Sequence, residues 1–305
     1  MMGIDFLVIG AQKSGTTALH EYASRHPQIF LPKGKEAPFF NRDEYYEKGL
    51  SYYLRKTFPN KKGAADVWGK VSPQYMCNRK VAERVYSDLP KVKVIALLRD
   101  PVKRAVSHYN MAYKRGLETR DINEAFSDLL SPSNIEKSRE LVSCIDNETS
   151  CYVAWSEYGR ILDYYLDLYK APPEVMYFED MIADPESFIK NFFSILGVDD
   201  GFLPPNLGEK VFSGDGGRID LMKRFREISL LKSAWRLLPI NVRSDFYFFF
   251  EQFLSKVSLR FHRGKKVAVS PNGELSDETL DRLRKHFIYD LQLSSSVSAH
   301  PKWFL

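Results

Sequence analysis

The feature that most constrains this chain is an apolar run that ends in a glycine loop near the N-terminus. Residues 6–9 read Phe-Leu-Val-Ile, which is typical of a strand buried in a parallel sheet. Gly10 ends that run, and the loop of residues 10–17 (GAQKSGTT) leads into an amphipathic helix. A strand, a tight loop and a helix N-terminus direct backbone N–H groups and the positive end of the helix dipole at one point. The sequence therefore predicts an anion site that fits a phosphate or a phosphosulfate.

The side chains of this loop indicate which kind of anion it binds. Lys13 adds a full positive charge, and Thr16 and Thr17 add hydroxyl donors. A nucleotide-triphosphate P-loop has the pattern G-x-x-x-x-G-K-[ST], in which the lysine directly follows the second glycine. Here Lys13 precedes Gly15 by two positions, and this spacing argues against a triphosphate site.

Strand and helix patterns alternate along most of the chain. We expect strands at residues 6–9, 28–31, 66–71, 92–98 and 174–178, and helices at 17–25, 44–56, 78–88, 102–114, 121–130, 152–169, 185–196 and 276–293. Such alternation predicts an α/β fold with a central parallel sheet flanked by helices on both faces. We expect a single domain over residues 1–305, with an elaborated helical and loop region at about 205–270.

The composition is that of a soluble globular protein. The chain has 305 residues, of which 44% are hydrophobic and 27% charged, and its net charge is +5. This charge suits an anionic ligand, but no basic stripe with interleaved aromatic residues predicts nucleic-acid binding. We find no apolar run long enough for a transmembrane segment and no signal peptide at the N-terminus of this sequence.

Cysteine and histidine usage gives further expectations. Cys144 and Cys151 could pair, but with only Cys77 besides them we expect free buried thiols. The six histidines and three cysteines form no close cluster, so no metal site is predicted. Together these features favour a cytoplasmic location.

A second candidate site follows the clearest predicted strand, residues 92–98. Arg99 comes directly after this strand, and open α/β sheets bind ligands at the carboxyl ends of their strands. Ser107 lies about two turns into the next helix. Arg99, as a bidentate donor, and Ser107 could hold a further phosphate. The alternative is that Arg99 pairs with a nearby acid and that Ser107 is a surface hydroxyl.

Together these segments resemble the PAPS-dependent sulfotransferases. The loop of residues 10–17 is similar to the 5′-phosphosulfate loop of that family, and residues 99–109 (RDPVKRAVSHY) are similar to its 3′-phosphate motif. The resemblance continues through residues 35–40 (KEAPFF), 69–75 (GKVSPQY), 158–197 and 283–303. The loop is most similar to heparan N-sulfotransferase-like and bacterial members. The resemblance implies a P-loop-like three-layer sandwich.

The resemblance also implies a reaction and roles. A sulfonate would pass from PAPS (3′-phosphoadenosine 5′-phosphosulfate) to an acceptor hydroxyl or amine by in-line displacement, which leaves adenosine 3′,5′-bisphosphate (PAP). Lys13 would neutralise the leaving phosphate, Glu36 would be the general base, and Lys70 would stabilise the sulfuryl group or hold the acceptor. A plain surface lysine is the alternative for Lys70. The implied cofactor-binding residues are Lys13, Ser14, Gly15, Thr16, Thr17, Arg99, Ser107 and Arg218.

Some positions depart from the family pattern. Gln12 stands where sugar-sulfating members often carry Arg, and Val71 stands where relatives often carry Lys before the Ser-Pro pair. Gln12 and the lack of an expected N-terminal anchor favour a soluble, bacterial-type relative over a Golgi heparan enzyme, while Val71 weakens the case for a catalytic role of Lys70. His108 is either an acid or base beside Ser107 or a packed histidine. The aromatic run at residues 246–261 either touches a membrane or lipid-like acceptor or lies in the core.

The acceptor and two rival functions stay open at this point. A carbohydrate, a lipid-linked glycan, a small metabolite and a carrier-tethered hydroxyl all fit as acceptors, and the oligomeric state is not predicted. One rival function is a P-loop nucleotide kinase or NTPase, against which the Lys13 spacing argues. The other is a catalytically inactive module that binds PAPS or PAP.

Overall fold

The computed structural model, which describes residues 3–32, 38–58, 66–142, 145–209 and 273–304, is built around one sheet. In this part of the chain, five parallel strands run in the order β2-β3-β1-β4-β5. The strands are β1 (Phe6–Gly10), β2 (Ile29–Phe30), β3 (Val67–Val71), β4 (Lys93–Leu98) and β5 (Glu174–Tyr177). The prediction of a central parallel sheet is therefore confirmed.

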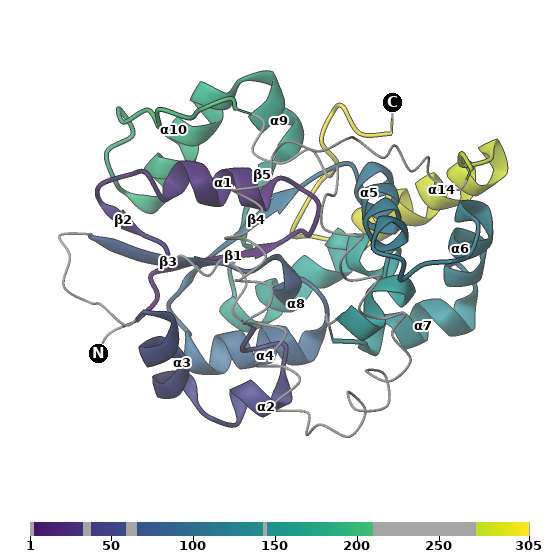
Figure 1. The fold of residues 1–305 in the computed structure, drawn as a ribbon, viewed down its shortest axis with the longest axis horizontal. Helices are drawn as coiled ribbons and strands as arrows, with labels where there is room; N and C mark the ends of the chain where they lie inside the picture. Colours follow the sequence, from purple (N-terminus) through teal and green to yellow (C-terminus); the bar gives the residue numbers. More distant parts are fainter. Residues whose placement is uncertain (1–2, 33–37, 59–65, 143–144, 210–272, 305) are drawn as a thin grey trace, which may run out of the picture.

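Helices cover both faces of this sheet (Figure 1). One face carries α1 (Thr16–Ala23), α9 (Phe178–Ala183) and α10 (Pro185–Leu196), and the other carries α2 (Asp43–Tyr46), α3 (Leu50–Thr57), α4 (Arg79–Asp88) and α8 (Tyr158–Tyr169). Successive side chains of a strand point to opposite faces, so Phe6 and Val8 pack with the first group and Leu7 and Ile9 with the second. The continuous apolar run of β1 is explained by this burial on both sides, and the three-layer prediction is confirmed.

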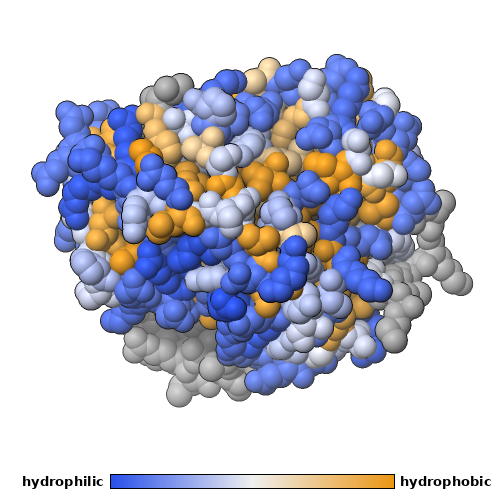
Figure 2. Space-filling view, turned by 180° about the vertical axis from the view of Figure 1, so that it is seen from behind, coloured by the Kyte–Doolittle hydropathy of each residue, from blue (hydrophilic) through white to orange (hydrophobic). Residues whose placement is uncertain are grey.

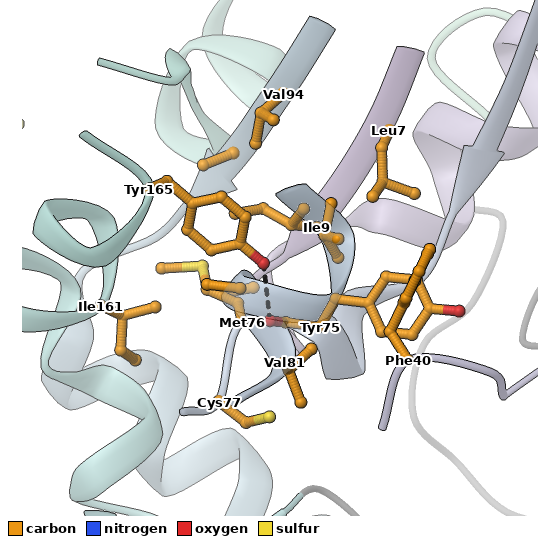
Figure 3. Close-up of a cluster of buried hydrophobic side chains, with 14 of the residues drawn as sticks. Leu7, Ile9, Phe40, Tyr75, Met76, Cys77, Val81, Val94, Ile161 and Tyr165 are labelled. Carbon is orange, nitrogen blue, oxygen red and sulfur yellow. Dashed lines mark hydrogen bonds between the residues drawn. The ribbon is translucent and has the colours of Figure 1, made fainter. Parts of the chain in front are cut away.

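The layer between the sheet and α4 and α8 fixes the segment that follows β3. Figure 3 shows Ile9 of the sheet beside Tyr165 of α8, and Leu7 and Ile161 belong to the same buried cluster. The Tyr165 hydroxyl donates a 3.1 Å hydrogen bond to the backbone carbonyl of Tyr75, in the 3₁₀ turn Pro73–Tyr75. The chain leaving the carboxyl end of β3 is thereby tied to α8.

A second group of helices lies beside the sheet and has its own core. It consists of α5 (Pro101–Lys114), α6 (Ile122–Leu129), α7 (Pro132–Glu140) and the C-terminal α14 (Asp277–Leu293). Tyr109 of α5, Phe126 of α6 and Phe287 of α14 are fully buried in this cluster. Because α5 also starts directly after β4, this cluster anchors the helix that carries the second predicted motif.

Several helix boundaries differ from the sequence-based predictions. The helix expected at 44–56 is two helices, because Gly49 between them has a left-handed φ of 81°. The helix expected at 152–169 begins at Tyr158, after two 3₁₀ turns, Ile145–Ser150 and Ala154–Ser156. Ahead of it, the Tyr152 carbonyl accepts from the Arg104 guanidinium and the Ser156 hydroxyl. The helices α7 and α9 were not predicted.

On the side drawn in Figure 2, the hydrophobic residues that the structure describes lie in groups separated by hydrophilic ones. The large exposed hydrophobic residues of the described ranges are spread over α4, α9, α14 and the loop after α10: Tyr86, Ile182, Leu203, Ile288, Tyr289 and Leu293. Within those ranges, every helix is too short or too polar to cross a bilayer.

Some predicted features lie outside the described residues. These are Glu36 and Arg218, Cys144, the aromatic run 246–261 and most of the expected elaboration at 205–270. The side chains of Cys77 and Cys151 are both buried. The pairing state of Cys144 and Cys151 stays a prediction, because Cys144 lies outside the described residues.

Candidate active site

The order of the strands brings the two predicted motifs to the same place. Strand β1 pairs with β4, and the Ala11 amide after β1 donates a 2.7 Å hydrogen bond to the Leu97 carbonyl of β4. The Arg99 guanidinium then donates to the backbone carbonyl of Lys13 at 3.1 Å. The loop of residues 10–17 and Arg99 therefore lie side by side at the carboxyl edge of the sheet.

The loop has a backbone that only a glycine at position 15 permits. Gly15 has a φ of 88°, and a Cβ there would lie 2.4 Å from the Met181 side chain and 2.8 Å from that of Phe178. Gly15 is the N-cap of α1, and it provides no side chain to occupy the first amides of the helix. The first turn of α1 also contains no acidic residue. The N-terminus of this helix thus offers N–H groups to an anion.

Lys13 lies close to several other positively charged side chains. Its pKa falls to about 8, mainly because the side chain is half-buried and further because Arg115 and Arg99 are close. Glu148 opposes this shift, and Lys114 adds to it. Cations held this close together repel one another, so an anion bound among them would be strongly favoured.

Arg99 is held in place by contacts with its ring and backbone neighbours, while Glu179 and Asp100 lie close enough to offset part of its charge. Its guanidinium lies 4.9 Å over the ring of Phe178, and its backbone carbonyl accepts from the Tyr158 hydroxyl at 2.9 Å. The adjacent Asp100 carboxylate instead caps α5 at Lys103 N and accepts from Phe304 N. Burial lowers the pKa of Arg99. Among the described residues, no carboxylate lies within 4.0 Å of the Arg99 guanidinium, although Glu179 and Asp100 are near enough to favour its charge.

The hydroxyl residues of the two motifs differ in exposure. Ser14 is fully buried beside Tyr158, and Thr16 is almost fully buried at the start of α1. Thr17 and, on α5, Ser107 are half-buried. The Ser14 side chain is thus directed into the protein, while those of Thr17 and Ser107 keep some contact with solvent.

Lys70 is a buried residue of the sheet. It lies opposite Leu7 in the β1–β3 pair, and its side chain has no exposed surface. The alternative of a plain surface lysine is therefore wrong. Cross-strand neighbours point to the same face, so Lys70 lies on the side of the sheet that also packs Phe39 and Phe40.

Two buried polar residues behind the loop were missed by the sequence prediction. The Glu148 carboxylate accepts from Arg115 at 3.1 and 3.2 Å, and the Gln12 side-chain amide lies 3.5 Å from it. Arg104 is fully buried and donates to the backbone carbonyls of Gln12 and Tyr152 and to the Ser156 hydroxyl. Arg104 belongs to the second motif, but nothing in the sequence indicates that it contacts the first.

A metal centre is not found among the described residues, which hold no group of three or more His, Cys, Asp or Glu side chains placed to bind an ion. A separate pocket of about 450 Å³ lies along β5, α9 and α10 and is lined by Tyr177, Asp180 and Phe188 among others. It contains none of the residues of the two motifs.

Comparison with known proteins identifies the family. A family model described as a sulfotransferase domain matches residues 4–206. The chain belongs to the sulfotransferase family. The matched region runs from β1 to the end of α10 and contains both motifs, Lys70 and the buried residues behind the loop.

Curated relatives of this sulfotransferase match over shorter stretches. A membrane-associated sulfotransferase, kil1, of Dictyostelium discoideum is 38% identical over 113 residues, which are 35% of this chain and 23% of that protein. Heparan sulfate glucosamine 3-O-sulfotransferase 5 of Mus musculus is 33% identical over 34% of this chain and 29% of its own. The mouse bifunctional heparan sulfate N-deacetylase/N-sulfotransferase 4 is 40% identical over 34% of this chain and 12% of its own. Each match thus spans less than a third of the relative.

The fold is shared with a solved sulfotransferase structure from Alicyclobacillus acidocaldarius. The two align with a TM-score of 0.55 at 23% identity, over 87% of this chain and 98% of the other. Together with the parallel sheet and its flanking helices, this likeness confirms the P-loop-like three-layer fold that the resemblance implied.

Proposed function

We propose that this sulfotransferase transfers the sulfonate of PAPS to a hydroxyl or amine of an acceptor. The observation that carries the proposal is the joined pair of anion sites, in which Arg99 is hydrogen-bonded to the backbone of Lys13. PAPS carries two separate anionic groups, a 5′-phosphosulfate and a 3′-phosphate, and two adjoining sites suit it. A triphosphate would need the lysine after the second glycine, which this loop lacks.

The residues present fit this cofactor. The narrow cradle at Gly15 and the open N-terminus of α1 would hold the 5′-phosphate, with Lys13 and Thr17 as further donors. Arg99 and Ser107 would hold the 3′-phosphate, and Arg99 is already oriented by Phe178. The bound cofactor supplies an activated sulfonate on a phosphate oxygen.

The chain's own contribution to the reaction would be position and charge. Lys13 would neutralise the charge that develops on the leaving phosphate, and the N–H groups of α1 would act in the same way without reorganising. Lys70, buried in β3 next to β1, would be a further cation at this edge of the sheet. Glu36 remains our candidate for the general base that takes the acceptor proton.

The acceptor class is proposed from the relatives. Two of them are named as heparan sulfate enzymes, one O- and one N-sulfating, so we propose a carbohydrate hydroxyl or amine as the first acceptor class to test. A lipid-linked glycan is the second class. Each match covers only about a third of this chain and less than a third of the relative, so the acceptor panel must be broad.

The test is a transfer assay with ³⁵S-labelled PAPS and a panel of glycans, lipid-linked glycans and small hydroxylated compounds. We expect label in at least one acceptor class, and we expect Lys13→Ala to abolish transfer and weaken PAP binding measured by calorimetry. Lys285→Ala, on α14 with 76% of its side chain exposed, is the matched control and should behave as wild type. PAP binding without transfer to any acceptor would favour an inactive binding module. Wild-type affinity of the Lys13→Ala variant for PAP would refute the site.

A further inference from the structure

A buried histidine lies directly behind the loop. His108 follows Arg104 by one helical turn on α5 and has no exposed surface. Its ring is stacked on that of Trp155 with centroids 5.4 Å apart and meets the ring of Tyr152 edge-on at 4.9 Å. Aromatic neighbours on two sides fix the orientation of the imidazole.

One guanidinium nitrogen connects this histidine to the loop. Arg104 Nη1 lies 3.4 Å from the Gln12 carbonyl and 3.4 Å from His108 Nδ1. A guanidinium has only N–H donors, so Nδ1 must be the acceptor in this contact. A neutral imidazole that accepts at Nδ1 carries its proton at Nε2. Arg104 therefore sets the tautomer of His108.

The charges around the ring keep it neutral. Burial lowers the pKa of His108 far below its ordinary value, and the nearby cations Arg104, Lys13 and Arg115 lower it further. Two acids of this region are paired with arginines, since Glu148 binds Arg115 and Glu118 binds Arg120 and the Tyr152 hydroxyl. The ring is thus a donor that keeps its proton over the whole physiological pH range.

The Nε2–H donor of this ring is not used within the described protein. His108 Nε2 is buried without a hydrogen-bond partner there, and so is the indole N–H of the stacked Trp155. Buried N–H groups are nearly always paired, so an unpaired one calls for an acceptor that the chain itself does not supply. The surrounding positive charge favours an anionic oxygen in that place.

We propose that His108 is a neutral hydrogen-bond donor to an anionic oxygen of the ligand held by the loop of residues 10–17, and that Arg104 is its positioning residue. This inference rests on the proposed function, because it takes PAPS or PAP as the ligand. It differs from a general-acid or general-base role for His108, since the ring neither gains nor loses a proton. It also assigns Arg104 a double contact that links the second motif to the first.

The proposal predicts a contrast between two variants. His108→Gln keeps an N–H donor near the position of Nε2, while His108→Phe keeps the ring and removes the donor. We expect His108→Phe to weaken PAP binding by about ten- to a hundredfold, the usual effect of losing one hydrogen bond to a charged group. His108→Gln should retain affinity within about threefold. His26→Phe, which removes another buried histidine that packs against Phe193 of α10, should leave PAP affinity unchanged.

Nuclear magnetic resonance on the wild-type protein supplies a readout that does not depend on a variant folding. In ¹⁵N-histidine-labelled protein, His108 should show the Nε2–H tautomer from pH 5 to 8, and its Nε2–H proton should move downfield when PAP is added. The proposal would be overturned by an unchanged resonance on PAP saturation or by wild-type PAP affinity of His108→Phe. Either result would indicate that a buried water, and not the ligand, accepts the hydrogen bond from Nε2–H. If wild-type protein does not bind PAP at all, the proposed function itself fails, and the two failures are thereby distinguished.

Discussion

The Arg99 guanidinium donates a 3.1 Å hydrogen bond to the backbone carbonyl of Lys13, across 86 positions of the sequence. This bond joins the segment after β4 to the loop after β1. Both residues are half-buried, and neither has a carboxylate within salt-bridge distance among the described residues. The site is therefore arranged as two fixed cations at the N-terminus of α1, and its properties follow from that arrangement.

The first prediction concerns pH and Lys13. Its pKa of about 8 means that the free protein begins to lose this charge as the pH rises through 8. An anion binds the protonated form preferentially, so PAP affinity should be highest near pH 7.5, where the phosphates of PAP are fully ionised, and should fall above about pH 8. Calorimetry at pH 8.5 in buffers of different ionisation enthalpy should show proton uptake on binding. Affinity that stays level up to pH 10 would contradict the prediction.

The second prediction concerns Arg99. Arg99→Lys keeps a positive charge but loses the planar group that lies over Phe178 and reaches the Lys13 carbonyl. We expect PAP affinity to fall by about ten- to a hundredfold, while thermal stability changes little. Arg79→Lys, on α4 with 52% of its side chain exposed, is the control and should bind PAP normally. An Arg99→Lys variant with wild-type affinity would remove this residue from the site.

The third prediction concerns Gly15. Gly15→Ala places a methyl group 2.4 Å from Met181 and 2.8 Å from Phe178, on a backbone with a φ of 88°. We expect a loss of about 1–3 kcal/mol in the free energy of unfolding from strain and overpacking, together with loss of PAP binding. Gly208→Ala is a matched control, because Gly208 also has a left-handed φ (78°) but no heavy atom within 4 Å of its Cβ position. Urea denaturation of both variants separates the effect of steric crowding from that of the left-handed backbone. Equal losses in the free energy of unfolding would show that crowding at Gly15 is unimportant.

The fourth prediction concerns a buried acid that stabilises the fold. Glu157 has no exposed side-chain surface, and its carboxylate binds Arg139, Arg160 and His286. Although its burial opposes ionisation, hydrogen bonds from His286 and Arg139 dominate and lower the pKa of Glu157 from 4.5 to about 2. Glu157→Gln should therefore lower the free energy of unfolding by about 3–5 kcal/mol at pH 7, because Arg139 and Arg160 lose their carboxylate partner.

The pH dependence of this effect has a definite sign. Between about pH 4.5 and 2 the unfolded chain binds a proton at Glu157 that the folded chain does not, so stability falls as the pH falls through that window. Thermal unfolding of wild type and variant should accordingly converge as the pH approaches 2. Glu136→Gln is the control, because Glu136 also pairs with Arg139 but its side chain is 69% exposed. Its free energy of unfolding should differ from that of the wild type by less than about 1 kcal/mol.

The fifth prediction concerns the general base. Glu36→Gln should abolish sulfonate transfer from labelled PAPS and leave PAP binding intact, because the base acts on the acceptor and not on the cofactor. Glu21→Gln, on the half-exposed side of α1, is the control and should turn over normally. Turnover at the wild-type rate by Glu36→Gln would exclude this residue from the mechanism.

Local patterns predicted the framework of the site well. The strand, loop and helix around residues 6–23, and the strand followed by Arg99 and α5, lie where the sequence indicates them. Both depend on interactions between near neighbours: apolar runs, a glycine with a positive φ and a proline in the first helical turn. The expectation of one helix over residues 44–56 was wrong, because the end of a helix there depends on the backbone conformation of a single residue, Gly49.

What the sequence by itself determined is the set of elements and the two cation-bearing motifs at their ends. Only the tertiary structure decided that β1 lies between β3 and β4, which places Arg99 against Lys13 and buries Lys70 in the sheet. It alone decided that Arg104 reaches both Gln12 and His108. The physical reason is that burial, charge compensation and tautomer are set by neighbours far away in the chain, and no local periodicity records which neighbours those are.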